Sequence, residues 1–388
     1  MKLAVLPPLQ YKETTPPKGR GNKSEELIMK TCVFLFLFFL MPGLVMSAVI
    51  QEDVDYKGWK CLVMKNDTTE VIVAPQLAGR IIQYRVDGND WLWVNESLAG
   101  KVFPPEENAN MDIWKNYGGD KIWPAPQGWD GTNETWPGPG DPVLTIPHEY
   151  EIVKGKGSEV TLRMTGSDED KGGHAGVRFI RELTLRDGSN RLEMKITMEN
   201  VSDRAVSWAI WEVAQMQWTD KGGKKGDHDW NEDAYLAIPM NPKSKWPEKY
   251  QVMFGLASSF NWQPDYERNL MIVRYENFVG KLVMDVSDGW AAMVDPQTGY
   301  TFVQRFPYDK KAEYADKGNF ELWVAGKGEF VHKNERRYAE DDPAVRFVEM
   351  EPQGPKVKLK PGKTTSIEFS WQVYEGGLDS VPEMNKRK

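Results

Sequence analysis

The stretch that decides the fold class reads VRFIRELTLRDGSNRLEMKITMEN and occupies residues 177–200. Apolar side chains stand at every second position in both halves, and this alternation predicts two β-strands that each bury one face. Between the halves, the Asp-Gly-Ser-Asn sequence of residues 187–190 supplies the chemistry of a hairpin turn. The stretch therefore predicts an antiparallel hairpin.

Alternating runs of the same kind recur along the chain, separated by Gly, Pro, Asn and Asp. A late run places on one face the side chains of Ile367, Phe369, Trp371 and Val373. Helical periodicity is scarce, and we find no internal repeat. The sequence therefore predicts an all-β fold, a large two-sheet antiparallel β-supersandwich that forms one domain over residues 49–388.

The aromatic content of the chain is unusual, since its 388 residues include 16 Trp, 14 Tyr and 15 Phe. Trp is normally core or interface material, and that is the simpler interpretation of any single one. Several together also suit a sugar site, because indole rings stack on the apolar C–H faces of pyranose rings. The formal net charge of -8 opposes nucleic-acid binding, which requires a basic face. A sugar site is therefore a second interpretation of the tryptophans beside the core interpretation, and no nucleic-acid partner is expected.

Residues 29–48 have the pattern of a secretory signal peptide, with a basic start, an apolar run over residues 33–40 and small residues at the end. Residues 1–28 are polar and rich in Pro and Lys, and we expect a non-native or unstructured extension there. The protein is thus expected to be exported, periplasmic or extracellular, without other membrane contact. Attachment to the membrane through an uncleaved segment is the alternative.

Two charged residues interrupt apolar rows of expected strands. Arg181 lies in the row of the strand over residues 177–185, and Glu212 lies in the row that runs from Trp208 to Trp218. Buried charges must be paired or used. Two interpretations stay open: a salt bridge between Arg181 and Glu212 on neighbouring strands, or two side chains that point into a ligand cleft.

Glu349 and Glu351 share one face of an expected strand over residues 345–351. Side chains two residues apart on a strand lie ~7 Å apart, close enough for two carboxylates to raise each other's pKa. A carboxyl group tuned in this way suits general acid or base catalysis. An exposed strand end with two solvated glutamates is the alternative.

The histidines give weaker signals. The sequence Asp227-His228-Asp229 resembles a metal cluster but lacks a spaced set of further ligands, so neither a metal nor another cofactor is predicted. His174 lies among glycines, where the backbone admits the close approach of a ligand. We therefore keep His174 as a candidate substrate contact, with a solvated loop histidine as the alternative.

Four segments together resemble the galactose-mutarotase-like superfamily, more narrowly a branch of it without an assigned activity. They are LAGRII at residues 77–82, YGGDKIWPAP at 117–126, the strand with Arg181 at 176–187, and RFVEMEPQ at 346–353. The match runs across most of residues 49–388, and the second segment is the most specific. The resemblance implies the β-sandwich fold and a saccharide ligand.

In sugar mutarotases of this fold, a Glu near the C-terminus is the base for the anomeric hydroxyl group, and a His protonates the ring oxygen. The Glu-Pro-Gln sequence that starts at Glu351 resembles the motif of that base, so Glu351 is the closest match and Glu349 the alternative in the same row. Where mutarotases carry the His, this chain reads WAIWEV at residues 208–213. Glu212 is the candidate acid there, provided that burial raises its pKa well above ~4.3.

The segment at residues 117–126 supplies the candidate binding residues. Its glycine pair permits close backbone approach to a ligand, Trp123 offers a stacking face, and Asp120 and Lys121 can bond hydroxyl groups. Lys121 and Arg181 together are also a candidate clamp for a carboxylate. We expect this segment to lie beside the strand that carries the two glutamates.

The sequence thus favours an exported carbohydrate-binding protein whose cleft is walled by two long irregular stretches, residues 103–147 and 219–264. A sugar-epimerase reaction through the C-terminal Glu is the enzymatic interpretation. The alternatives are a non-catalytic carbohydrate-binding or cell-envelope structural module and a polysaccharide lyase-like enzyme that uses Lys121 and Arg181.

Overall fold

A computed structural model describes residues 47–104, 107, 115–127, 146–167, 175–220, 228–255, 260–332 and 335–386. Nearly all of the expected signal segment lies outside these residues, and so does His174. Residues 46–388 form one compact unit. Within the described residues, β-strands prevail, as predicted, and no helix has the length and apolar character needed to cross a membrane.

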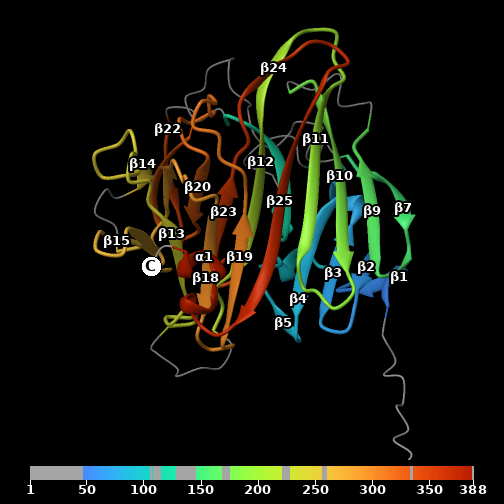
Figure 1. Ribbon diagram of the computed structural model, residues 1–388, viewed down its shortest axis with the longest axis horizontal. Helices are drawn as coiled ribbons and strands as arrows, with labels where there is room; N and C mark the ends of the chain where they lie inside the picture. The colour runs from blue at the N-terminus through green and yellow to red at the C-terminus, as the bar shows by residue number, and fades with distance from the viewer. Residues whose placement is uncertain are drawn as a thin grey trace, which may run out of the picture. The chain divides into compact units, whose positions relative to one another are not determined.

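The largest sheet has ten antiparallel strands. In order across the sheet they are β15 (Trp262–Asp265), β16 (Leu270–Val273), β13 (Tyr235–Pro239), β18 (Trp290–Asp295), β19 (Tyr300–Arg305), β25 (Thr364–Glu375), β11 (Leu192–Asn200), β10 (Val177–Arg186), β9 (Glu159–Thr165) and β7 (Glu149–Lys154). The predicted hairpin is the β10–β11 pair, which Figure 1 shows beside β25.

Two further large antiparallel sheets are present. The six-stranded sheet has the order β5 (Asn89–Asp90), β4 (Arg80–Val86), β3 (Thr69–Ala74), β2 (Trp59–Lys65), β1 (Ala48–Tyr56), β8 (Lys156–Gly157). The seven-stranded sheet has the order β14 (Gln251–Gly255), β17 (Gly280–Met284), β20 (Phe320–Val324), β23 (Phe347–Pro352), β12 (Val206–Gln217), β24 (Val357–Leu359), with β6 (Asp120–Ala125) paired to β12.

The remaining elements are small. They are the hairpin of β21 (Gly328–His332) and β22 (Glu335–Ala339) and the short helices η1 (Pro75–Leu77), η2 (Glu96–Leu98), η6 (Leu378–Ser380) and α1 (Pro382–Asn385). Scarce, short helices agree with the sequence analysis.

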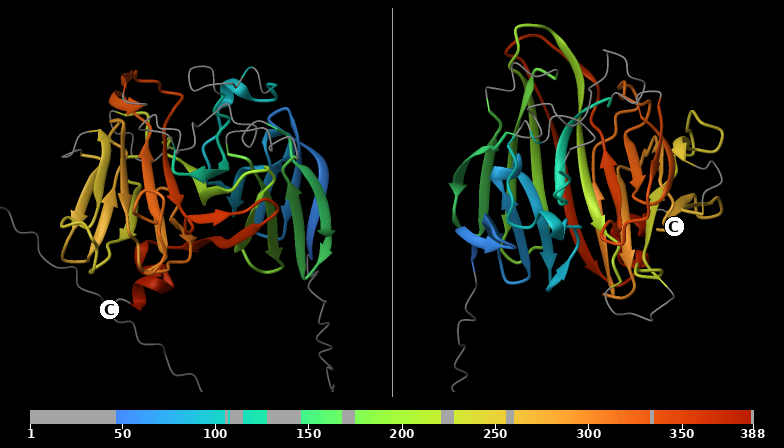
Figure 2. Two further views of the ribbon diagram at one scale, coloured as in Figure 1. Left: turned by 90° about the horizontal axis from the view of Figure 1, so that it is seen from above. Right: turned by 180° about the vertical axis from the view of Figure 1, so that it is seen from behind.

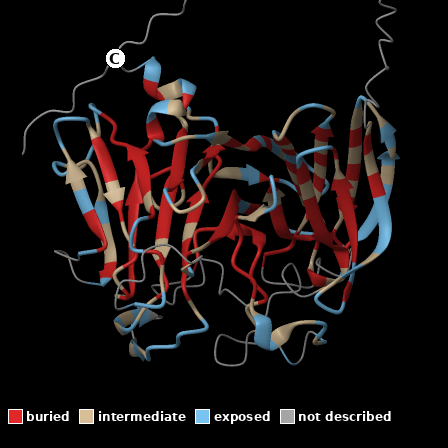
Figure 3. Cartoon of the chain, turned by 90° about the horizontal axis from the view of Figure 1, so that it is seen from below, coloured by how far each residue is buried: buried red, intermediate tan, exposed pale blue. Residues whose placement is uncertain are grey.

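One continuous hydrophobic core joins the three large sheets. Tyr84 of β4 packs edge to face against Phe302 of β19 and Trp371 of β25, so the six-stranded sheet lies on the ten-stranded one. Phe306, directly after β19, stacks on Phe320 of β20, so the seven-stranded sheet also lies on the ten-stranded one. Figure 2 shows these layers from two sides, and Figure 3 shows the buried residues along the facing strands. The predicted antiparallel sandwich is confirmed, but the second layer is divided into two sheets.

The predicted alternation holds along the core strands. On β10 and β11 every second side chain is buried, and the two strands pair from Val177 with Asn200 to Leu185 with Leu192. β12 differs because nearly all of its twelve residues are buried, which means that both of its faces are covered. This strand therefore separates the sandwich core from a second buried region.

The charge of Arg181 is neutralised inside the core by Asp120. Both side chains are at most 1% exposed, and the guanidinium forms a two-pronged ion pair with the carboxylate and also donates to Gly79 O at 2.6 Å. Asp120 Oδ1 in addition accepts a hydrogen bond from Ile81 N at 2.6 Å. Arg181 thus joins β10 to β6 across the sandwich, and Asp120 joins β6 to β4.

Glu212 faces the same interior as Arg181, as predicted, but the two do not lie on neighbouring strands. β10 belongs to the ten-stranded sheet and β12 to the seven-stranded sheet. Glu212 accepts a hydrogen bond from Gln304 of β19, and Arg181 pairs with Asp120. The direct Arg181–Glu212 salt bridge, one of the two open interpretations, is therefore wrong, because Asp120 pairs with the guanidinium.

The glycine pair at 118–119 serves the backbone of the protein itself. A Cβ atom on Gly118 would lie 2.3 Å from Trp93 O, and one on Gly119 would lie 2.4 Å from Ile81 O. Both residues also have positive φ angles, which favour glycine. The pair is therefore required for close packing of chain on chain, and the expectation that it admits a ligand is not met.

The stretch at residues 219–264, expected to be irregular, contains β13, β14 and the start of β15. β13 reads YLAIP and is buried over four of its five residues. Its apolar run is too short to stand out among the flanking Gly, Pro and charged residues.

Replacing Arg181 by Met should lower the free energy of unfolding by about 3–5 kcal/mol, because the Asp120 carboxylate stays buried without its cation. The double variant Arg181→Met/Asp120→Asn should recover part of this loss, since neither charge of the pair remains. Urea unfolding followed by tryptophan fluorescence measures both. An Arg181→Met protein within about 1 kcal/mol of the unmodified protein would contradict the importance of the pair.

Candidate functional site

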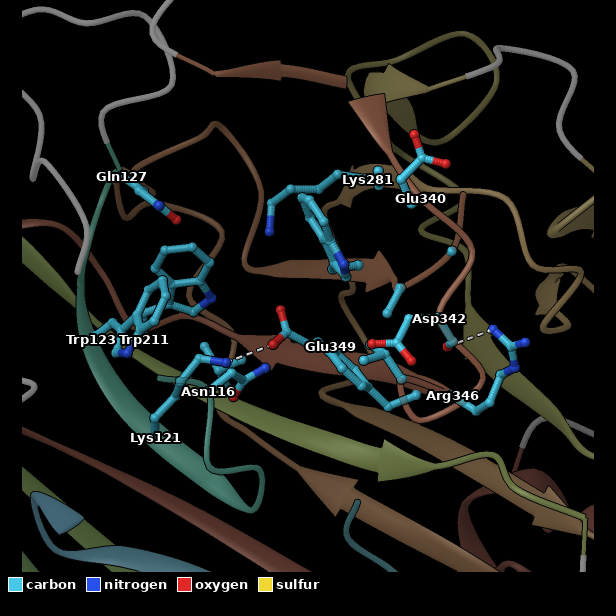
Figure 4. A pocket seen from close by; sticks show the side chains of 17 residues that line it. Asn116, Lys121, Trp123, Gln127, Trp211, Lys281, Glu340, Asp342, Arg346 and Glu349 are labelled. Atoms are coloured by element: carbon cyan, nitrogen blue, oxygen red, sulfur yellow. Dashed lines mark hydrogen bonds and ion pairs between the residues drawn. The ribbon is translucent and has the colours of Figure 1, made fainter. Parts of the chain in front are cut away.

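A cavity of about 280 Å³ lies on the face of the seven-stranded sheet that points away from the sandwich core. Side chains of that face form its floor, and residues 339–347 contribute a wall (Figure 4). From the expected wall at residues 103–147, the lining residues are Asn116, Lys121, Trp123 and Gln127, whereas none of the described residues between 219 and 264 lines the cavity.

The period of two along each strand decides which side chains reach this cavity. On β12, Trp211 and Val213 line it, whereas Glu212 between them points into the core. On β6, Lys121 and Trp123 line it in the same way, because Lys121 pairs with Val213 and Trp123 pairs with Trp211. Strand register therefore gathers charged and aromatic side chains on one floor.

Lys121 and Glu349 form an ion pair in the cavity. Lys121 Nζ lies 2.6 Å from Glu349 Oε1, and Gln215 Nε2 donates to the same oxygen at 2.9 Å. The Lys121 and Glu349 side chains are 3% and 14% exposed. Glu349 Oε2 makes no hydrogen bond to a described residue. Glu349 thus has one oxygen held in place and one oxygen available.

Burial lowers the pKa of Lys121 below its ordinary value, and the positive charge of Arg80 lowers it further. Glu349 and, more weakly, Glu351 act in the opposite direction. The ammonium also lies 4.9 Å from the ring centroid of Trp123. The proton of Lys121 is therefore retained chiefly through its pairing with Glu349.

A second buried charge cluster lies beside the floor. Lys281 Nζ is 2.6 Å from Glu351 Oε2 and 2.9 Å from Glu321 Oε2, and all three side chains are at most 1% exposed. Burial by itself lowers the pKa of Lys281, but the two carboxylates raise it above its ordinary value. Burial raises the pKa of Glu351 to about 8 and that of Asp316 to about 9. Lys281 is thus held as an ammonium between the carboxyl groups of Glu321 and Glu351.

Aromatic rings supply the apolar surface of the cavity. The indoles of Trp123 and Trp211 meet edge to face with centroids 5.5 Å apart, and Trp323 and Phe347 also line the cavity. The indole N–H of Trp211 is buried and has no acceptor among the described residues. Apolar rings around a few fixed polar groups are the usual construction of a small-ligand site.

Arg346 fixes the wall beside the floor. Its Nη1 donates to Asp341 at 2.8 Å and its Nε donates to Asp229 at 3.0 Å. The guanidinium carbon lies 5.4 Å from the ring centroid of Trp230 and 5.9 Å from that of Tyr275. Arg346 therefore ties the wall to the segment with Asp229 and Trp230 and to the segment with Tyr275.

Three of the predicted site residues meet in this cavity: Lys121, Trp123 and Glu349. The expectation that residues 117–126 lie beside the strand with the two glutamates is confirmed by the Lys121–Glu349 ion pair. The chemical roles assigned to these three residues stay predictions.

The other predicted site residues lie elsewhere. Asp120, Arg181 and Glu212 are on the core face of the sheets and do not line the cavity, so the proposed carboxylate clamp of Arg181 with Lys121 is wrong. Glu351, the closest match to the motif of the base, is buried against Lys281 and does not line the cavity either. His174 lies outside the described residues.

Sequence reasoning missed Trp211, Trp323 and Lys281. Lys281 interrupts the buried apolar row of Val279 and Val283, which is the same signal that identified Arg181. The tryptophans carried no comparable signal, because core tryptophans look the same in sequence. In the described part of the chain, no group of three or more His, Cys, Asp or Glu side chains is placed to hold a metal ion.

No protein-family model matches this chain, and no curated protein matches it. Solved structures with a similar fold are found. A galactose mutarotase-like protein from Clostridium acetobutylicum has a TM-score of 0.51 at 12% identity, over 85% of this chain and 99% of that one. A TPR-domain containing protein from Parabacteroides distasonis has a TM-score of 0.52 at 13% identity.

The second match covers 87% of this chain but 56% of the other, so this chain spans little more than half of that longer protein. At such low identity the likeness concerns the fold alone. The sandwich topology and these matches together show that the chain has a fold similar to that of the galactose mutarotase-like protein.

Proposed function

We propose that the cavity binds a saccharide and that Glu349 takes the proton of its anomeric hydroxyl group, so that the protein acts as an aldose-epimerase-like isomerase. The observation that carries this proposal is the Glu349 carboxylate, which stands on an aromatic floor with one oxygen fixed and the other available. A general base needs such a defined direction toward the proton that it removes.

The character of the cavity supports a sugar. Trp123, Trp211 and Trp323 offer apolar surface for a sugar ring, and Lys121, Glu349 and the Trp211 N–H offer polar partners for hydroxyl groups. Its volume is near the lower end of ligand pockets, roughly 300–1,000 Å³. This size suits a single sugar ring better than a long chain.

A second candidate function is saccharide binding without turnover. The ion pair favours it, because Lys121 neutralises the Glu349 carboxylate in the free protein. The two functions differ in one measurement, the rate of anomer interconversion.

Replacing Trp123 by Ala should weaken sugar binding about tenfold, because an aromatic contact contributes roughly 0.5–1.5 kcal/mol beyond its buried area. Saturation-transfer NMR with a panel of monosaccharides, followed by titration calorimetry, measures the change. Trp246→Ala is the matched control, since Trp246 lies outside the cavity. Equal effects of the two substitutions would argue against binding in this cavity.

Replacing Glu349 by Gln keeps the shape of the side chain but removes the base. We expect binding to stay within a few-fold of the unmodified protein, while the rate of anomer interconversion falls by about 10²–10⁴, the usual contribution of a general base. Polarimetry of freshly dissolved α-anomers measures this rate. An unchanged rate would refute the assignment of Glu349. Binding by the unmodified protein without any rate above buffer would instead favour the non-catalytic function.

We also propose that the protein is exported. The support is the basic, apolar and small-residue pattern of residues 29–48. N-terminal sequencing of the protein from the extracytoplasmic fraction of its host should find the mature end near residue 48. Recovery from the cytoplasm with residues 29–48 intact would contradict export.

A further inference from the structure

Opening a sugar ring requires an acid for the ring oxygen as well as a base for the anomeric hydroxyl group. We propose that Lys121 is this acid, and that its ammonium group donates a proton to the ring oxygen while Glu349 takes a proton from the anomeric hydroxyl group. This inference rests on the proposed function of the cavity.

The distance between the two groups suits the reaction. The anomeric hydroxyl oxygen and the ring oxygen are bonded to the same carbon, so the acid and the base must be close neighbours. Lys121 Nζ and Glu349 Oε1 are 2.6 Å apart, and both side chains line the cavity (Figure 4). They come from β6 and β23, which pair with opposite edges of β12. A sugar whose anomeric carbon lies over this pair meets both groups.

The other cations that line the cavity are unsuited to proton donation. Lys281 is held by Glu321 and Glu351, whose charges strengthen its hold on its proton. Arg346 is paired with two aspartates, and a guanidinium does not release a proton in proteins. Glu212, the acid candidate from sequence, is on the opposite face of β12 and does not line the cavity.

The charges around Lys121 couple the two proton transfers. Among the described groups that act on it are Glu349 and Glu351 of β23, Arg80 of β4 and Glu212 of β12. Burial and Arg80 favour the neutral amine, and Glu349 opposes them. When Glu349 takes up the proton of the sugar, it loses the negative charge that stabilises the ammonium. Lys121 therefore becomes a stronger acid as negative charge develops on the ring oxygen.

The step balances without an oxidant, reductant or further reactant. The proton of the anomeric hydroxyl group moves to Glu349 Oε2, and the electron pair of that O–H bond forms the carbonyl group. The bond between the anomeric carbon and the ring oxygen breaks, and the ring oxygen keeps its electrons and takes a proton from Lys121 Nζ. The open-chain aldehyde rotates about its first carbon–carbon bond. Ring closure on the other face reverses both proton transfers and restores the ion pair.

The test compares Lys121→Arg and Lys121→Gln with the unmodified protein. The probes are freshly dissolved α-D-glucose, α-D-galactose and α-D-xylose, and polarimetry gives the rate of anomer interconversion. Arg keeps a cation beside Glu349 but cannot supply the proton, so a purely structural role is rescued by Arg and an acid role is not. We expect both variants to lose at least about 100-fold in rate, the lower end of general acid catalysis, with sugar affinity within about threefold.

The pH profile provides a second readout. The rate of the unmodified protein should fall as pH rises through the pKa of Lys121, which lies below its ordinary value, because the ammonium form donates the proton. Lys121→Arg should lack this alkaline decline. The control is Lys195→Arg, an exposed substitution on β11, which should leave rate and profile unchanged.

Each outcome decides a separate point. A folded Lys121→Arg protein with the unmodified rate overturns the assignment of Lys121 and leaves the proposed function intact. If the unmodified protein binds sugar but shows no anomer interconversion above the buffer rate, the assignment of Lys121 as acid is also overturned. The proposed sugar binding is then retained. Failure of all three sugars to bind the folded protein overturns the proposed function, and this inference with it.

Discussion

The position of β6 depends on the buried ion pair of Asp120 with Arg181. β6 is a short strand that pairs with β12. Asp120 fixes the start of β6 to β10 through the guanidinium of Arg181, and to β4 through Ile81 N. Arg80 Nη1 adds hydrogen bonds to Gly118 O and Asp120 O. Successive side chains on a strand point to opposite faces, so anchoring Asp120 in the core directs Lys121 into the cavity.

One sheet thus separates two sets of buried charges with different uses. On the core face, the charges of Asp120 and Arg181 neutralise each other and hold strands together. On the cavity face, Lys121 pairs with Glu349 where a ligand can reach both. A buried ion pair contributes little net stability compared with apolar packing, because desolvating both groups opposes their attraction. Under the proposed function, the exposure of Glu349 to the cavity serves the ligand and not the stability of the fold.

Local patterns in the sequence predicted the strands, and pairing between distant segments decided the site. The alternation of residues 177–200 and 367–373 identified buried faces correctly, because the period of two is a local property. A local pattern cannot identify the partner of a buried charge in a distant segment. Arg181 and Asp120 are 61 positions apart, and Lys121 and Glu349 are 228 apart. Glu351 fitted the motif better than Glu349. Glu351 is instead held below the cavity floor by Lys281, and no local pattern links these two residues.

A crystal structure of the protein soaked with a monosaccharide examines this site most directly. We expect one sugar ring in the cavity, with an apolar face against Trp123 or Trp211. Its anomeric hydroxyl group should lie within hydrogen-bond distance of Glu349 Oε2, and its ring oxygen should lie within that distance of Lys121 Nζ. A sugar bound elsewhere, or bound here with its anomeric carbon directed away from both groups, would contradict the proposed acid and base.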